Sequence, residues 1–320
     1  MKKEIGIFTL LVVLCAVTGF ENPRFFSQAN LVNIANLIGL YGIFSIGLGL
    51  VIITGGIDLS VGSMIALGGM LLVLALTEWH WPWPVAAAFT LVVTMSLGLA
   101  HGFLITRFKM QPFIVTLCGL LLYRGIARFI ANDTTKGFGD AAGFKTLQAL
   151  ASGKMLGVPM PFVFLVIIAI IMWIVLHRST YGRYLFAVGR NEEATRFSGI
   201  NTRWIVASTY VLAGLLTGIS AILFAFYTNS VSPSNHGNFY ELYGIAAAVL
   251  GGCSLRGGEG SIIGILIGTA LLLVLQNLVN LLGIPSSLNF AVMGAVVLLG
   301  VLADQIFQAR SAKKTVRVSK

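Results

Sequence analysis

Residues 25–57 read FFSQANLVNIANLIGLYGIFSIGLGLVIITGGI and contain no Asp, Glu, Lys or Arg. A helix needs about 20 mostly apolar residues to cross the hydrocarbon core of a bilayer, so this run is long enough for one crossing. Residues 204–240 and 260–303 are also free of these charges, and the latter run is long enough for two crossings. Because the runs are continuous rather than alternating, we expect spanning helices and not the strands of a β-barrel.

The composition of the whole chain extends this expectation. Of its 320 residues, 57% are hydrophobic and 10% are charged, whereas soluble domains carry about 25% charged residues. Such a composition excludes a soluble enzyme, a nucleic-acid-binding protein and a disordered chain. The net charge of +10 comes from basic residues in short clusters between apolar runs, which is typical of one face of a membrane protein. We therefore predict an all-α, polytopic membrane protein that forms a single domain over residues 1–320.

Ten spans can be drawn, the first of them as a retained helix rather than a cleaved signal peptide. They cover about 5–20, 34–54, 61–77, 85–106, 112–131, 160–177, 204–227, 239–252, 261–282 and 288–305. With both termini in the cytoplasm, 15 of the 21 Lys and Arg residues lie on the cytoplasmic side and four lie outside. Cytoplasmic loops carry such an excess. We therefore predict a multi-pass protein of the bacterial inner membrane, with a basic cytoplasmic tail at about 306–320.

Two short segments resemble each other. Residues 55–59 read GGIDL and residues 251–255 read GGCSL, and each leads through Gly-Ser into an apolar helix. The span at 239–252, which runs into the second segment, is too short to cross a bilayer. Duplicated halves with re-entrant or broken helices are common in transporters, so the two segments indicate two related halves.

Asp58 stands in the first of these segments, between two apolar runs. A carboxylate inside a membrane is costly unless it is paired or faces water. Asp58 and Ser60 are therefore candidates for a substrate path or for gating. The alternative is structural, since Asp58 can cap the helix that begins near Ser60.

Three amide side chains lie near one face of the ninth span, because Gln276, Asn277 and Asn280 are spaced at i, i+3 and i+4. Neutral amides suit a sugar path, since hydrogen bonds of modest strength allow release. They are equally suited to bond a neighbouring helix.

The histidines and cysteines lack metal-ligand spacing, and the chain contains neither a Walker A loop nor a catalytic constellation. We predict no enzyme activity, no metal and no cofactor.

The most polar stretch is 178–203, within which a short helix is predicted. Asn191 can cap it, two glutamates follow in the first turn, and Gly199 is suited to end it. Its apolar face consists of Ala194, Phe197 and Ile200. Such a helix lies on lipid headgroups or docks a cytoplasmic partner.

Several of these segments resemble one family. The residues EAT at 193–195, followed by Gly199, resemble the EAA-x-x-x-G coupling motif of ABC importer permeases, with Thr in place of the second Ala. Longer strings resemble ribose-type monosaccharide permeases, and they stand in the right order. They are GGIDLSVGS at 55–63, YGRY at 181–184, NEEATRFSGIN at 191–201, YEL at 240–242, AAAVLGG at 246–252 and GGEG at 257–260. Tyr243 and Gly244 depart from this pattern, where an acidic residue followed by Ala is expected.

The resemblance implies the membrane subunit of an importer that forms the path for ribose or a similar monosaccharide. The implied partners are a cytoplasmic ABC ATPase, a periplasmic or extracellular sugar-binding protein, a second copy or a related permease, and membrane lipid, but no nucleic acid. The implied ATPase-coupling residues are Arg190, Asn191, Glu192, Glu193, Ala194, Thr195, Phe197 and Gly199. The candidate path residues are Asp58, Ser60, Glu241, Gln276, Asn277 and Asn280.

Two alternatives stay open. A stand-alone secondary transporter or channel for a small polar solute would need titratable groups within the membrane, for which Asp58 and Glu241 are candidates. A permease of the same class with another substrate, such as autoinducer-2 or a branched-chain amino acid, is the nearer alternative.

Overall fold

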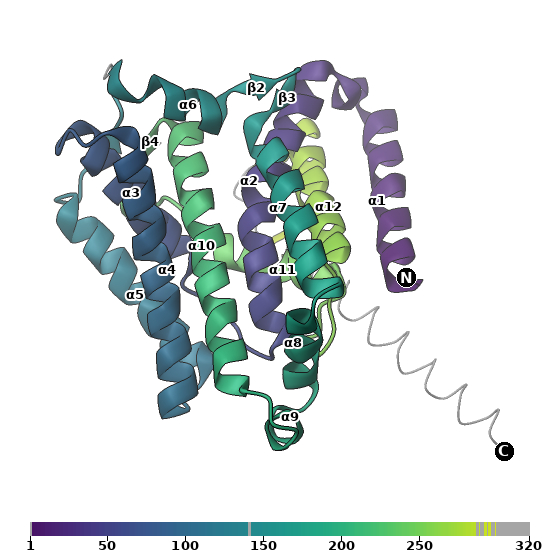
Figure 1. The fold of residues 1–320 in the computed structure, drawn as a ribbon. Helices are drawn as coiled ribbons and strands as arrows, with labels where there is room; N and C mark the ends of the chain where they lie inside the picture. The colour runs from purple at the N-terminus through teal and green to yellow at the C-terminus, as the bar shows by residue number, and fades with distance from the viewer. Residues whose placement is uncertain are drawn as a thin grey trace.

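The computed structural model describes residues 2–139 and 142–285, together with 288, 291, 292, 294, 295 and 298. The long helices lie side by side as a bundle (Figure 1). The helices are α1 (Lys2–Glu21), α2 (Gln28–Ile53), α3 (Val61–Thr77), α4 (Trp83–Phe108), α5 (Pro112–Ile130), α6 (Lys145–Ser152), α7 (Met160–His177), α8 (Thr180–Arg190), α9 (Glu192–Phe197), α10 (Thr202–Thr228), α11 (Tyr240–Leu250) and α12 (Ile262–Leu281). Two 3-10 turns, η1 (Pro23–Phe26) and η2 (Ala142–Phe144), and four two-residue strands, β1 (Lys136–Gly137), β2 (Lys154–Met155), β3 (Val158–Pro159) and β4 (Ser230–Val231), complete the described chain.

The prediction of an all-α, polytopic membrane protein is confirmed. Within the described ranges, seven helices are long and apolar enough to cross a membrane, namely α1, α2, α4, α5, α7, α10 and α12. The predicted spans at 61–77 and 239–252 are present as the shorter apolar helices α3 and α11. The predicted tenth span, at about 288–305, and the basic tail at about 306–320 lie outside the described residues, apart from a few isolated positions in the span.

The bundle has two distinct ends. At the strand end, β1 pairs antiparallel with β4, and the Lys136 ammonium lies 2.7 Å from a carboxylate oxygen of Glu78 after α3. At the α9 end, the short helices α8 and α9 lie beyond α7 and α10 (Figure 1). The backbone N–H of Gly258 donates there to the carbonyl oxygen of Ile53 (2.8 Å), joining the end of α2 to the segment after α11. When the shorter apolar helices α3 and α11 are counted with the seven long ones, successive apolar helices therefore run in alternating directions between the two ends.

Helices α2 and α10 form the centre of the bundle. In each of them, 78% of the most apolar stretch of 18 residues is buried. Small residues allow neighbouring helices to approach these two closely. For example, an added Cβ at Gly98 of α4 would collide with the carbonyl oxygen of Tyr210 on α10. The same holds for α12, where a Cβ at Gly264 or Gly268 would collide with the backbone of α11 or of the glycine that follows it. Close backbone packing thus replaces large side chains at these crossings.

The two arginines of α5 lie toward the strand end. The Arg124 guanidinium donates to the carbonyl oxygens of Pro233 (3.1 Å) and His236 (2.6 Å), so it fixes the segment that leads into α11. Arg128 donates to both carboxylate oxygens of Asp133 (2.6 and 3.2 Å). These bonds hold the pKa of the exposed Asp133 carboxyl below its usual value.

An amide pair joins α2 to α12 at the strand end. The side chains of Asn30 and Asn277 exchange two hydrogen bonds of 3.1 and 2.7 Å.

This pair can be tested with Asn30→Leu, Asn277→Leu and the double variant. Each single change leaves one amide unpaired, so the two single losses of stability should add up to more than the loss in the double variant. A double-mutant cycle of detergent unfolding should give a coupling free energy of about 0.6–1.7 kcal/mol. A coupling energy of zero would contradict this role of Asn277.

Candidate functional site

Helix α9 begins and ends as the sequence predicts. The side-chain oxygen of Asn191 accepts from the backbone N–H of Ala194 (2.9 Å), which caps the first turn. Gly199 has φ +84, a left-handed conformation that favours glycine, and its N–H donates to the carbonyl oxygen of Arg196 (3.0 Å). The helix itself is shorter than the predicted segment 191–200, since α9 covers only Glu192–Phe197.

Of the predicted apolar face Ala194, Phe197 and Ile200, only Ile200, which follows α9, is partly buried against the bundle. Thr195 is buried, and its hydroxyl donates to the carbonyl oxygen of Asn191 (2.7 Å). Ala194 is exposed, and Phe197 is 79% exposed, with the Arg196 guanidinium 5.7 Å above its ring. An aromatic ring at the tip of a polar end of the bundle is a feature typical of a docking surface.

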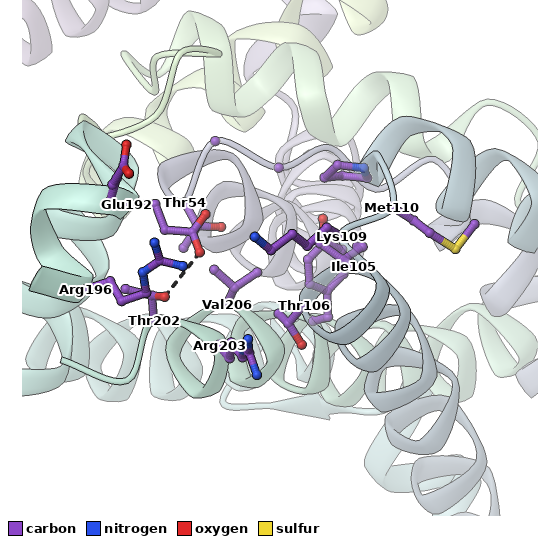
Figure 2. Close-up of a pocket in the computed structure, with 15 residues that line it drawn as sticks. Thr54, Ile105, Thr106, Lys109, Met110, Glu192, Arg196, Thr202, Arg203 and Val206 are labelled. Atoms are coloured by element: carbon purple, nitrogen blue, oxygen red, sulfur yellow. Dashed lines mark hydrogen bonds between the residues drawn. The ribbon is translucent and has the colours of Figure 1, made fainter. Parts of the chain in front are cut away.

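A cavity of about 570 Å³ lies between α9 and the segment after α2 (Figure 2). Two of the predicted coupling residues, Glu192 and Glu193, line it, and the other six do not. Glu192 accepts a hydrogen bond from the hydroxyl of Thr202 (3.1 Å), which ties α9 to the first turn of α10. The remaining lining residues are Thr54, Gly55, Gly56, Ile105, Thr106, Lys109, Met110, Pro112, Arg196, Thr202, Arg203, Val206 and Tyr210.

Helix α8 joins α9 to the centre of the bundle through a glycine junction, which we define as Gly55, Gly189, Gly257 and Gly258. A Cβ at Gly189 would collide with the carbonyl oxygen of Ile53 and the backbone nitrogen of Gly258. A Cβ at Gly257 would lie 2.7 Å from the carbonyl oxygen of Gly189 and 2.9 Å from the nitrogen of Gly55. Three backbones therefore meet without side chains between them. The sequence signal for this junction is a glycine within a helical stretch, which sequence reasoning alone did not single out.

The cap of α9 allows a local test. Replacing Asn191 by alanine removes the acceptor for the Ala194 N–H, and loss of such a cap costs about 1 kcal/mol. We expect the amides of α9 to exchange with solvent several-fold faster, whereas the unfolding midpoint of the whole bundle stays nearly constant because α9 is peripheral. Hydrogen-exchange mass spectrometry on the detergent-solubilised protein measures this. Unchanged exchange across α9 would contradict the cap.

The predicted path residues Asp58 and Ser60 lie before α3 and are buried. One carboxylate oxygen of Asp58 accepts from the backbone N–H (2.8 Å) and from the hydroxyl (2.6 Å) of Ser60. These contacts form a tight turn before α3 and are not a helix cap, because no side chain bonds to the free N–H groups at the start of α3, whose N-cap residue is Ser60. Three polar side chains that sequence reasoning missed lie together near this turn: the His101 ring is 5.5 Å from that of Tyr123 and 6.4 Å from that of Tyr210, and the Tyr210 hydroxyl lies against Gly56. The Tyr123 hydroxyl is hydrogen-bonded to Nε2 of His101 (2.7 Å).

Glu241 is near this group, whereas the amides of α12 are not. The buried Glu241 carboxylate packs against Gly62 in the first turn of α3. Asn277 instead pairs with Asn30, and the 23 residues between Asn30 and the end of α2 span about 35 Å. The structure therefore divides the predicted path residues into two groups, one around the start of α3 and one at the strand end of α12, the latter comprising Gln276, Asn277 and Asn280.

The apolar bundle, the interruption between α2 and α3 and the exposed helix α9 together define a multi-pass membrane protein. The chain belongs to the family described as the permease component of branched-chain amino acid transport systems, which matches residues 30–301. The resemblance to ribose-type permeases is confirmed as well. The ribose import permease protein RbsC of Bacillus subtilis (strain 168) is 36% identical over 314 residues, covering 95% of this chain and 94% of that protein.

Other relatives cover as much of the chain. RbsC of Escherichia coli (strain K12) is 39% identical over 294 residues, which cover 92% of this chain and 91% of that protein. The autoinducer 2 import system permease protein LsrD of Enterobacter sp. (strain 638) is 32% identical over 308 residues, which cover 96% of this chain and 94% of that protein. Both similarities run over the α2–α3 break and the α9 segment, so they extend across both parts of the site.

Proposed function

We propose that the chain is the membrane subunit of an ABC importer for a ribose-type monosaccharide, in the bacterial inner membrane. The single observation that carries this proposal is the identity of 36–39% to ribose import permeases over more than nine-tenths of the chain. In this account a separate ATPase supplies the energy, and a sugar-binding protein delivers the substrate at the strand end.

The exposed face of α9 supports docking of the ATPase at the α9 end. Phe197 offers an apolar contact, and the adjacent charges of Glu193 and Arg196 offer polar ones. The direct backbone contacts of the glycine junction would transmit a movement of α9 to the interruption between α2 and α3. Alternating access then follows if ATP-driven movement shifts the bundle between two states.

The orientation of the chain is supported by its charges. The α9 end carries a group of arginines and lysines on α4, α8, α9 and α10 and in the loops beside them, and such a group favours the cytoplasmic side. Both termini would then be cytoplasmic. A second copy or a related permease completes the path in this proposal.

Autoinducer-2 is the second candidate substrate, because LsrD is 32% identical to the chain. A branched-chain amino acid receives support only from the description of the family. A stand-alone secondary transporter is disfavoured, since the family consists of components of larger transport systems.

Uptake into proteoliposomes tests the proposal. The chain, its ATPase and its binding protein are reconstituted, and accumulation of labelled D-ribose, autoinducer-2 and leucine is measured with and without ATP. We expect ATP-dependent accumulation of D-ribose and none of leucine. Accumulation of leucine alone, or uptake driven by an ion gradient without ATP, would contradict the proposal.

A further inference from the structure

A second cavity, of about 230 Å³, opens at the strand end between α2, the cap formed by α6, β2 and β3, and the end of α10. Its polar lining includes the amides of Asn33 and Asn36 on α2 and the phenol of Tyr227 on α10. Within the described part of the chain, neither amide is hydrogen-bonded to another residue. Its lining contains no carboxylate, and its one charge is the ammonium of Lys154.

A cluster of tyrosine rings lies deeper in the bundle below this cavity. The rings of Tyr41 and Tyr240 are 4.9 Å apart, and those of Tyr41 and Tyr243 are 5.5 Å apart. Tyr41 is five residues beyond Asn36 on α2, a rise of about 8 Å. Tyr227 lines the cavity and follows Phe224 by one turn of α10, and the Phe224 ring lies 5.3 Å from that of Tyr41 and 4.8 Å from that of Tyr240. It therefore links the cavity to the cluster.

The chemistry of this arrangement fits one class of ligand. Amides without partners offer both donors and acceptors to hydroxyl groups. Aromatic faces with a negative quadrupole suit the weakly positive C–H groups on the flat side of a sugar ring. A carboxylate or ammonium ligand would demand an opposite charge inside the cavity, and the lining supplies only one exposed ammonium at its edge.

We propose that this cavity is a carbohydrate subsite, in which Asn33 and Asn36 bind sugar hydroxyls and Tyr227 covers the apolar face of the ring. The pair Tyr41 and Tyr240 is the next contact along the path. This inference rests on the proposed function and adds to it the entry site of the monosaccharide. It assigns the first contact to α2 and α10, and not to the amides of α12.

The experiment compares four variants with the wild type. Tyr227→Leu removes the ring, Tyr227→Phe keeps the ring without its hydroxyl, and Asn36→Leu removes an amide. Gln148→Leu is the matched control, because Gln148 is an exposed amide on α6 outside the cavity. Each full-length protein is placed in lipid nanodiscs, its unfolding midpoint is recorded, and saturation-transfer NMR with D-ribose is measured. ATP-driven uptake of D-ribose is then measured in proteoliposomes.

We expect saturation transfer to the ring protons of D-ribose in the wild type and in Gln148→Leu. Loss of one good contact lowers affinity by about fivefold to tenfold, so Tyr227→Leu and Asn36→Leu should reduce signal and uptake by about this factor. Tyr227→Phe should show the smaller loss. If wild-type proteoliposomes import D-ribose but Tyr227→Leu and Asn36→Leu match the control, the subsite is wrong and the proposed function stands. If the wild type imports no D-ribose, the proposed function fails and the subsite fails with it.

Discussion

Replacing Gly189 by alanine is expected to reduce ATP-driven uptake by at least about tenfold and to lower the stability of the protein. The added methyl group would collide with the backbones of Ile53 and Gly258, and a backbone cannot move aside as a flexible side chain can. Overpacking of this kind costs about 1–3 kcal/mol. The three segments would have to separate, which breaks the contact between α8 and the end of α2. Uptake into proteoliposomes and the unfolding midpoint in detergent measure the two effects.

Gly125→Ala is the matched control for this variant. Gly125 is also helical, on α5, but an added Cβ there meets nothing within 4 Å. Alanine has the higher helix propensity, so this variant should be as active as the wild type and slightly more stable. If Gly189→Ala behaved like Gly125→Ala, the glycine junction would have no part in transport.

Replacing Asp58 by leucine is the second change with a large expected effect. It would leave the backbone N–H of Ser60 without its acceptor in a site that is only 2% exposed, and the Ser60 hydroxyl would keep only the weak sulfur acceptor of Met64 (3.2 Å). Each unsatisfied buried donor costs about 1–3 kcal/mol, so a loss of about 2–5 kcal/mol is expected. The unfolding free energy in denaturant measures it. Uptake should fall with the amount of folded protein.

Asp58→Asn separates the structural role of the turn at Asp58 and Ser60 from a role in the path. Asparagine keeps a side-chain oxygen that can accept from Ser60, so this variant should retain most of the stability and of the uptake. A fully stable but inactive Asp58→Asn would contradict a purely structural role and favour a role of Asp58 in the path. As a control, Asp133→Asn changes an exposed carboxylate at the strand end and should alter neither quantity by much.

The helices could be predicted where apolar length decides the structure. The charge-free run at 25–57 contains α2, and the predicted span at 61–77 coincides with α3. Such apolar sequences are placed in lipid or in a protein interior, where a helix satisfies their backbone polar groups. The cap at Asn191 and the turn at Gly199 could also be predicted, since both act over three or four residues. The ends of α9 are harder to predict from sequence, because a helix of one or two turns is too short to show a clear apolar periodicity.

Contacts between distant segments could not be predicted in this way. Nothing near Gly189 in the sequence indicates that Ile53 and Gly258 lie against it. Asn277 bonds to Asn30 across 247 positions, so its amide could be assigned equally to a path or to a helix contact until the packing was seen. Likewise, nothing in the apolar pattern of Ala194, Phe197 and Ile200 indicates that Thr195 is the residue of α9 that is buried against the bundle. In each case tertiary packing, and not local periodicity, decides the outcome.

Copurification of an ATPase with the wild type and with Phe197→Asp tests the central claim most directly. Phe197 is exposed in the single chain, so the substitution should leave the fold intact while placing a charge on the docking face. Leu156→Asp is the control, because Leu156 is 98% exposed at the strand end. We expect an ATPase to copurify in mild detergent with the wild type and with Leu156→Asp. It should be lost from Phe197→Asp. Absence of an ATPase from the wild type, or its full retention by a folded Phe197→Asp, would contradict the central claim.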